Sequence, residues 1–259
     1  MQPQLESQLK QVVQMFKAEL KADTLKGLVY IISTLVDETK IAINADTISM
    51  KAMDPAHVAM MEIVVDKDAF ISYEADETEI GLDLDKIKTV LKLAGPNDTI
   101  RMEHDPDQGR LTITIGNIVR RMSVVDTSGM NDPKVPQMEL PVSVKIPIDQ
   151  LQKGIRAAES ISDHIKLMAD PNGFELSCEG DMDYASLRVP VSDLESIVAD
   201  AAVTSLYPLD YFSNIVKVIP AGTVVDIQLD NDYPVKFLFN LAEGHARVVY
   251  FLAPRIENE

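Results

Sequence analysis

The stretch LDKIKTVLKL at residues 84–93 recurs without a gap as LDYFSNIVKV at residues 209–218. Both copies share the skeleton Leu-Asp-x-apolar-x-x-(Val/Ile)-(Leu/Val)-Lys-(Leu/Val), which has the spacing of an amphipathic helix. They lie about 125 residues apart, close to half of the 259-residue chain. A repeat of this length predicts two similar domains in tandem, and a feature present in both copies is expected to serve the architecture first.

A second pair of segments agrees with the first. Leu25-Lys26-Gly27-Leu28 resembles Lys153-Gly154-Ile155, which Leu151 precedes, and both segments open a run with helical apolar spacing. Each half of the chain is therefore expected to contain two helices.

Short runs of β-forming residues separate these helices, as in antiparallel sheets. The expected helices span residues 23–37, with Asp23 or Thr24 as its cap, 85–93, 149–162 and 210–219. The expected strands span residues 16–20, 40–44, 48–52, 57–65, 79–82, 99–103, 110–115, 120–125, 142–147, 165–169, 174–178, 185–191, 224–229, 235–240 and 246–252. The order repeats, which predicts an α+β fold built twice from one unit.

The boundary between the two units is expected at residues 127–141. This segment contains Gly129, Asn131-Asp132-Pro133, Pro136 and Pro141, so neither a helix nor a strand can run through it. We therefore expect a Gln-rich N-terminal extension at residues 1–14, a first domain at 15–126, a connecting loop at 127–141 and a second domain at 142–259.

The composition limits the classes of protein. The net charge of −17 argues against a surface that grips phosphates everywhere, but it allows positive charge confined to one face. Cys178 is the only cysteine, so an internal disulfide is excluded. No run of 18 apolar residues and no signal-peptide pattern occurs, so no membrane association is expected.

Motifs of common enzyme classes are missing from the sequence. There is no P-loop, no dinucleotide fingerprint, no Gly-x-Ser-x-Gly and no His-Glu-x-x-His. The four histidines (His57, His104, His164 and His245) are scattered, without the spacing of metal ligands. We expect neither catalysis, nor a metal, nor a cofactor.

Each expected helix exposes at least one cation. In the third helix, Leu151, Ile155 and Ala158 form an apolar stripe, and Lys153 and Arg156 fall on the opposite side. If all four exposed faces point one way, they form a basic lining within an acidic body. Such a surface contacts phosphates without reading bases.

Three further segments complete the pattern: Met53–Val58, Val135–Pro141 and Leu252–Glu257. With the repeated helices, they make the chain from Met15 to Glu259 resemble a DNA sliding clamp of the proliferating cell nuclear antigen family, archaeal or eukaryotic. The closing Leu-Ala-Pro-Arg-Ile-Glu is specific to that family, and Met15-Phe16 resembles its usual start.

The resemblance implies a closed homotrimeric ring of six domains, with four helices per chain on the inner face and antiparallel sheets outside. The ring encircles double-stranded DNA without sequence specificity. A hydrophobic pocket beneath the connecting loop holds peptides of the clamp loader, DNA polymerase and other replication and repair proteins. The location is the cytoplasmic nucleoid of an archaeon or the nucleus of a eukaryote. Two alternatives stay open: one subunit of a heterotrimeric or checkpoint-type clamp, and a peptide-docking scaffold that never encloses DNA.

The resemblance also assigns residues to three sites. The DNA-facing cations are Lys21, Lys26, Lys86, Lys88, Lys92, Lys153, Arg156 and Lys217. The partner-peptide pocket comprises Met53, His57, Val58, Met60, Val135, Pro136, Pro234, Phe251, Ala253, Pro254 and Ile256. The subunit interface comprises Arg120, Arg121, Met122, Val124, Ala185, Leu187 and Val189, on two edge strands that need a partner or a guard.

Overall fold

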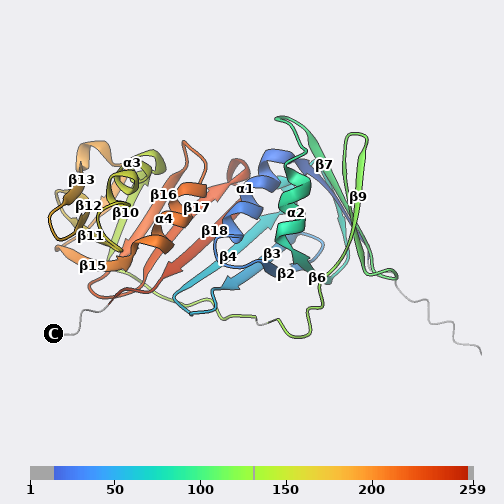
Figure 1. Cartoon of the computed structure of the whole chain (residues 1–259), viewed down its shortest axis with the longest axis horizontal. Coiled ribbons are helices and arrows are strands. Elements are labelled where there is room, and N and C mark those ends of the chain that lie inside the picture. The colour runs from blue at the N-terminus through green and yellow to red at the C-terminus, as the bar shows by residue number, and fades with distance from the viewer. Residues whose placement is uncertain (1–14, 131, 256–259) are drawn as a thin grey trace, which may run out of the picture.

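The computed structural model describes residues 15–130 and 132–255 (Figure 1). The predicted extension at residues 1–14 and the predicted pocket residue Ile256 lie outside the described residues.

The two halves of the chain have the same order of elements. The first half contains β1 (Phe16–Lys21), α1 (Ala22–Ile32), β2 (Glu38–Ile43), β3 (Thr47–Met53), β4 (Ala59–Asp66), β5 (Ser72–Ala75), β6 (Thr78–Asp83), α2 (Leu84–Leu91), β7 (Thr99–Asp105), β8 (Arg110–Ile115) and β9 (Ile118–Ser123). The second half contains β10 (Val142–Pro147), α3 (Ile148–Ala158), β11 (His164–Asp170), β12 (Gly173–Glu179), β13 (Tyr184–Pro190), β14 (Ser196–Val198), β15 (Val203–Pro208), α4 (Leu209–Val218), β16 (Val224–Leu229), β17 (Val235–Leu241) and β18 (Ala246–Leu252). The predicted α+β repeat is confirmed.

Three strands were not predicted. β5 and β14 are edge strands of four and three residues, too short for a clear alternation. β15 does alternate, with Val203, Ser205 and Tyr207 buried, but a serine at one inward position and Pro208 at its end hide the pattern.

The first helix starts and ends earlier than predicted. Lys21, not Asp23 or Thr24, occupies the N-cap, and no side chain caps the helix. The chain passes directly from β1 into α1, and the Ala22 N–H donates to the Asp98 carbonyl instead. At the other end α1 stops at Ile32, because residues 33–35 form turns rather than a further helical turn.

The predicted match of Lys26 with Lys153 is wrong by one position. β1 ends at Lys21 and β10 at Pro147, so the two helices align at an offset of 126 residues. Leu25 then matches Leu151, and both are buried. We call such matched residues counterparts: the counterpart of Lys26 is Gln152, and that of Lys153 is Gly27.

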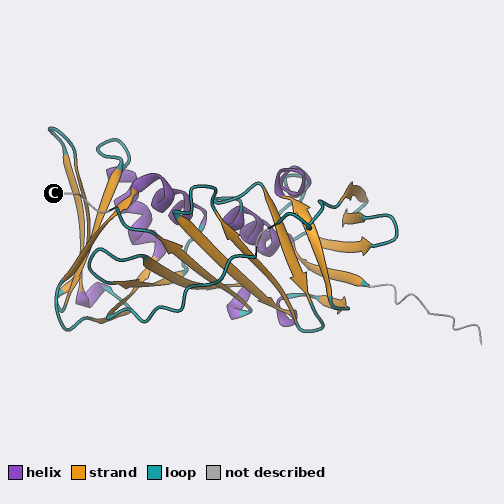
Figure 2. Cartoon of the chain, turned by 90° about the horizontal axis from the view of Figure 1, so that it is seen from below, coloured by secondary structure: helices purple, strands orange, loops and turns teal. Residues whose placement is uncertain are grey.

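Helices and strands form separate layers. The strands form three sheets. A five-stranded sheet has the order β5-β1-β7-β8-β9, and a four-stranded sheet has the order β13-β12-β11-β15. The nine-stranded sheet contains strands of both halves, in the order β14-β10-β16-β17-β18-β4-β3-β2-β6. Contacts between α2 and α1, α1 and α4, and α4 and α3 place the helices in one row. Figures 1 and 2 show this row on a single side of the nine-stranded sheet. No helix of the described residues is long and apolar enough to cross a membrane.

The nine-stranded sheet has its longest uninterrupted ladders at its centre. The ladders β17–β18, β18–β4 and β4–β3 each contain seven residue pairs. On either side the pairing is interrupted: β16–β17 stops at Asp226–Leu238, and β2–β3 stops at Ile41–Met50. We call these openings the β16–β17 split and the β2–β3 split.

Candidate functional site

A small apolar cluster lies outside the main core, on the outer face of the four central strands. Its buried members are Met60 on β4 and Val249 and Phe251 on β18. Met60 lies opposite Phe251 in the β18–β4 ladder, while the adjacent pair Met61–Tyr250 faces the helices and belongs to the main core. The outer cluster comprises Met53, Met60, Val135, Met138, Leu238, Val249 and Phe251.

The connecting loop covers this cluster with Val135 and Met138. From Val248 on, β18 is apolar on both faces, which is typical of a strand that is covered on both sides. An apolar hollow covered by an extended loop accepts apolar anchors, and its backbone edges accept extended peptide.

Four predicted pocket residues meet in the outer cluster: Met53, Met60, Val135 and Phe251. The remaining described ones are not members of this cluster. Pro136 and His57 are exposed, and Pro234, Ala253 and Pro254 are half-buried. Val58 packs against the main core, and its carbonyl accepts the Ala253 N–H at 2.8 Å, which fixes the start of the C-terminal tail.

Sequence reasoning missed Met138, Leu238 and Val249. The alternation of β18 carried a signal for Val249, because it lies two residues from Phe251 and therefore on the same face. Nothing in the local sequence marks Met138, whose position depends on the path of the connecting loop.

Asp54 organises the loop between β3 and β4. Its carboxylate accepts backbone N–H groups of Ala56, Val58 and Ala59 at 2.6–2.9 Å and the Tyr211 hydroxyl at 2.8 Å. Burial raises the pKa of Asp54, but these hydrogen bonds outweigh it and hold that pKa below its usual value. The hydrogen bond to Asp54, and then burial, raise the pKa of Tyr211 to about 12.

The predicted DNA-facing cations fall into two groups. Five have acceptors within the protomer: Lys86 with Asp83 at 2.8 Å, Lys88 with Asp85 at 2.7 Å, Lys21 with Glu243 at 3.4 Å, Lys217 with Glu159, and Lys26 with the Ala94 carbonyl at 2.8 Å. Lys92, Lys153 and Arg156 are exposed, and none has an ion-pair partner within the described part of the chain.

Lys26 and its counterpart Gln152 make the same kind of contact. The Lys26 ammonium binds the carbonyl of Ala94 at the end of α2, and the Gln152 amide binds the carbonyl of Ile219, the counterpart of Ala94, at 3.1 Å. Both side chains therefore bind carbonyls at or just beyond the C-terminal end of a helix. Lys26 is thus a structural residue in this geometry as well as a cation.

Glu159 links the two helices of the second half. Its carboxylate accepts hydrogen bonds from Lys217 and from Ser213, both on α4. The contact with Lys217, and then that with Ser213, lowers the pKa of Glu159. Lys217 is therefore largely neutralised by its own chain.

The strands β9 and β13 are edges of their sheets. On β9, Ile118, Val119, Arg120 and Arg121 are exposed. On β13, Ala185 and Leu187 are half-buried. The predicted interface residues Met122 and Val189 are buried within their own domains, and Val124 is half-buried beyond the end of β9.

Two family models match the chain. The model of the N-terminal domain of proliferating cell nuclear antigen covers residues 15–130, and that of the C-terminal domain covers residues 134–255.

Curated relatives are named DNA polymerase sliding clamp. That of Methanocella arvoryzae is 39% identical over 246 residues, which is 95% of this chain and 100% of the relative. That of Haloarcula marismortui is 34% identical over 248 residues, again 95% of this chain and 100% of the relative.

Solved structures of PCNA match the fold of this chain. The A. fulgidus PCNA bound to the C-terminal region of FEN-1 matches with a TM-score of 0.88 and 30% identity, covering 95% of this chain and 100% of that one. PCNA from Thermococcus kodakaraensis matches with a TM-score of 0.86 at 22% identity, covering 93% of this chain and 100% of that one, and supports the fold alone.

Proposed function

Because the chain belongs to the proliferating cell nuclear antigen family, we propose that it is a DNA polymerase sliding clamp. Three copies form a ring around duplex DNA. The ring tethers the polymerase and other replication and repair proteins by peptides docked in the outer cluster. The observation that carries this proposal is the single row of helices whose exposed side holds Lys92, Lys153 and Arg156, three cations without an ion-pair partner among residues 15–130 and 132–255.

The repeat suggests how the ring closes. Within the protomer, β18 pairs with β4, and Val248 lies opposite Ile63. The counterparts of these strands are β9 and β13, the two sheet edges described above. If β9 of one protomer pairs with β13 of the next, six domains are joined by six similar junctions.

The ladders also suggest the register of this junction. Following the pairs from strand to strand, Ile118 is the counterpart of Val248, and Leu187 is the counterpart of Ile63. Ile118 of one protomer is therefore expected opposite Leu187 of the next. Apolar contacts at both edges of one chain favour self-assembly over a role as one subunit of a heterotrimer.

The grip on DNA is expected to be weak. Of the predicted DNA-facing cations, three per protomer have no ion-pair partner among the described residues, which gives nine in a trimer, whereas the protomer carries a net charge of −17. Phosphate contacts of this kind carry no sequence information and weaken with salt. Enclosure by the ring, rather than affinity, then holds the clamp on DNA.

This role is non-catalytic and requires no cofactor. The curated relatives that match are archaeal, so we place the protein at the nucleoid of an archaeal cell.

The mass of the chain in solution tests the ring. At micromolar concentration we expect three times 28.7 kDa, or about 86 kDa, by light scattering. Replacing Ile118 by Asp should yield a folded monomer that no longer supports processive synthesis on circular DNA. A wild-type chain that stays monomeric under all conditions would contradict a homotrimeric clamp and favour a heteromeric subunit.

A further inference from the structure

The β2–β3 ladder ends one residue pair before the corresponding ladder of the second domain does. In the second domain, β11–β12 pairing continues to Lys166–Ser177. The counterparts of this pair are Lys40 and Lys51, and they are not paired. A cavity of about 630 Å³ occupies the opening, lined by these two lysines, by Glu38 and Met53, and by Asp132 and Pro133 of the connecting loop.

Four residues direct backbone polar groups into this split. The Asp37 carbonyl accepts the N–H of Leu84, the residue that directly follows β6, so by the alternation of a strand Glu38 and Lys40 face β3. The Asp54 N–H donates to Ala59 on β4, so by the same alternation Lys51 and Met53 face β2. Among the described residues, none of the four has a ladder partner on the facing strand.

Unpaired backbone edges of this kind are templates for an added strand. The edge of β3 is also continuous with the outer cluster, because Met53 belongs to both. Pro133 lines the cavity, and Val135, two residues further along the loop, covers the outer cluster. A chain anchored in the outer cluster therefore has a direct path into the split.

We propose that the segment of a partner protein that flanks its anchoring peptide enters the β2–β3 split and pairs, in extended conformation, with the backbone of Lys51 and Met53. The inference rests on the proposed function, since it requires the anchor in the outer cluster. It adds a second element of recognition, which acts through the backbone of the partner.

Charges around the split support recognition by the backbone. Lys51 is paired with Asp132 at 3.3 Å, and Lys40 with Glu79 at 3.2 Å. Asp54 already accepts four hydrogen bonds. Since these groups are satisfied, the flanking segment is selected for extended backbone rather than for charged side chains.

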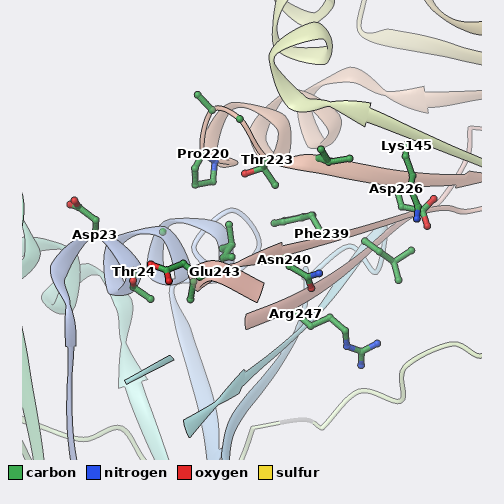
Figure 3. Close-up of a pocket in the computed structure, with 17 residues that line it drawn as sticks. Asp23, Thr24, Lys145, Pro220, Thr223, Asp226, Phe239, Asn240, Glu243 and Arg247 are labelled. Atoms are coloured by element: carbon green, nitrogen blue, oxygen red, sulfur yellow. The ribbon is translucent and has the colours of Figure 1, made fainter. Parts of the chain in front are cut away.

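The β16–β17 split is larger, at about 790 Å³, but it fits this role less well (Figure 3). Figure 3 shows its two strands diverging from Asp226 toward Thr223 and Asn240. The Thr223 carbonyl accepts the Ile148 N–H, so among the described residues of the two strands only Val224 and Asn240 direct backbone groups into the opening. Its described lining contains no residue of the connecting loop.

Amide hydrogen exchange of the full-length chain tests the proposal. The probes are two peptides from the C-terminal region of FEN-1: one holding the anchor alone, and one extended by about six residues on each side. The extended peptide should slow exchange at Lys51 and Met53 and bind roughly tenfold more tightly, because each net hydrogen bond contributes a factor of several. The anchor peptide should change neither amide. Ala52, which faces β4, is the internal control.

N-methylation of the extended peptide sharpens the test. Methyl groups on the alternate flanking amides that face β3 should abolish the gain in affinity, whereas methyl groups on the intervening amides should leave it unchanged. If both peptides perturb Met60 and Phe251 with equal affinity and leave Lys51 and Met53 unprotected, the added strand is refuted and the docking pocket stands. If neither peptide perturbs the outer cluster, the pocket and the added strand fall together.

Discussion

The hydroxyl of Tyr211 donates a 2.8 Å hydrogen bond to the carboxylate of Asp54 and so joins the two halves of the protomer. Tyr211 lies in the first turn of α4, in the helix row, and Asp54 holds the loop beside the outer cluster. This bond therefore connects the face proposed for DNA with the face proposed for partner peptides.

Tyr211→Phe should destabilise the protomer and loosen the loop at residues 54–58. A buried carboxylate that loses one donor costs about 1–3 kcal/mol of unfolding free energy. We expect that loss in urea unfolding, together with weaker binding of a FEN-1 peptide. Tyr233→Phe is a suitable control, because Tyr233 is exposed and its contact with Tyr207 uses the backbone carbonyl. Equal stability of both variants would contradict the role of this bond.

Lys26→Gln should preserve stability, and Lys26→Ala should lower it by about 1 kcal/mol. The reason is that Gln152 satisfies a helix-end carbonyl at the counterpart position without any charge. Thermal unfolding of the two variants distinguishes this role from a role in DNA binding. If Lys26→Gln lowers the stability as much as Lys26→Ala does, the hydrogen bond to the Ala94 carbonyl is not the source of the stabilisation.

Lys153→Ala combined with Arg156→Ala should shorten the residence of the loaded clamp on DNA and reduce the salt dependence of that residence. Each lost phosphate contact lowers the slope of log affinity against log salt by about 0.9. Lys86→Ala combined with Lys88→Ala removes the same net charge from residues that Asp83 and Asp85 already neutralise. That control should have the smaller effect, and FEN-1 peptide binding should be unchanged in both.

Stability should fall as the pH drops below about 6.5, the usual histidine value, because of His104. Its Nδ1 is buried without a hydrogen-bond partner among the described residues, and burial lowers the pKa of His104. Below pH 6.5 the unfolded chain therefore binds a proton that the folded chain does not. The variant His104→Gln should show a smaller change of unfolding free energy between pH 7.5 and pH 5.5 than the wild-type chain does. A second loss below about pH 4, from Asp54 and Glu159, should remain, since the pKa of each is lowered.

The amide of Asn240 should exchange with solvent faster than that of Leu238. Both amides face β16, but Leu238 lies in the β16–β17 ladder opposite Asp226, and that ladder stops two pairs before Asn240. Hydrogen exchange followed by mass spectrometry of overlapping peptides can compare the two sites. Equal protection would mean that the split is closed in solution.

The sequence by itself determined the repeated unit, the four helices and most of the strands. These features follow from local periodicity: Leu84 and Ile87 are buried because of their spacing on one helix, and the same holds for Leu209 and Phe212. Local patterns failed where the structure has little periodicity, as in β5 and β14, and where one helix follows directly on a strand, as at Lys21.

Only the tertiary structure decided which of the expected groups are available to a partner. The sequence suggests that Lys217 and Lys26 are free cations. In the structure, Lys217 is paired with Glu159 at the end of α3, and Lys26 binds the carbonyl of Ala94. The pairing of β18 with β4 and the two splits depend likewise on segments far apart in the chain. Charge pairing and strand pairing depend on distance in space, and periodicity along the chain carries no information about that distance.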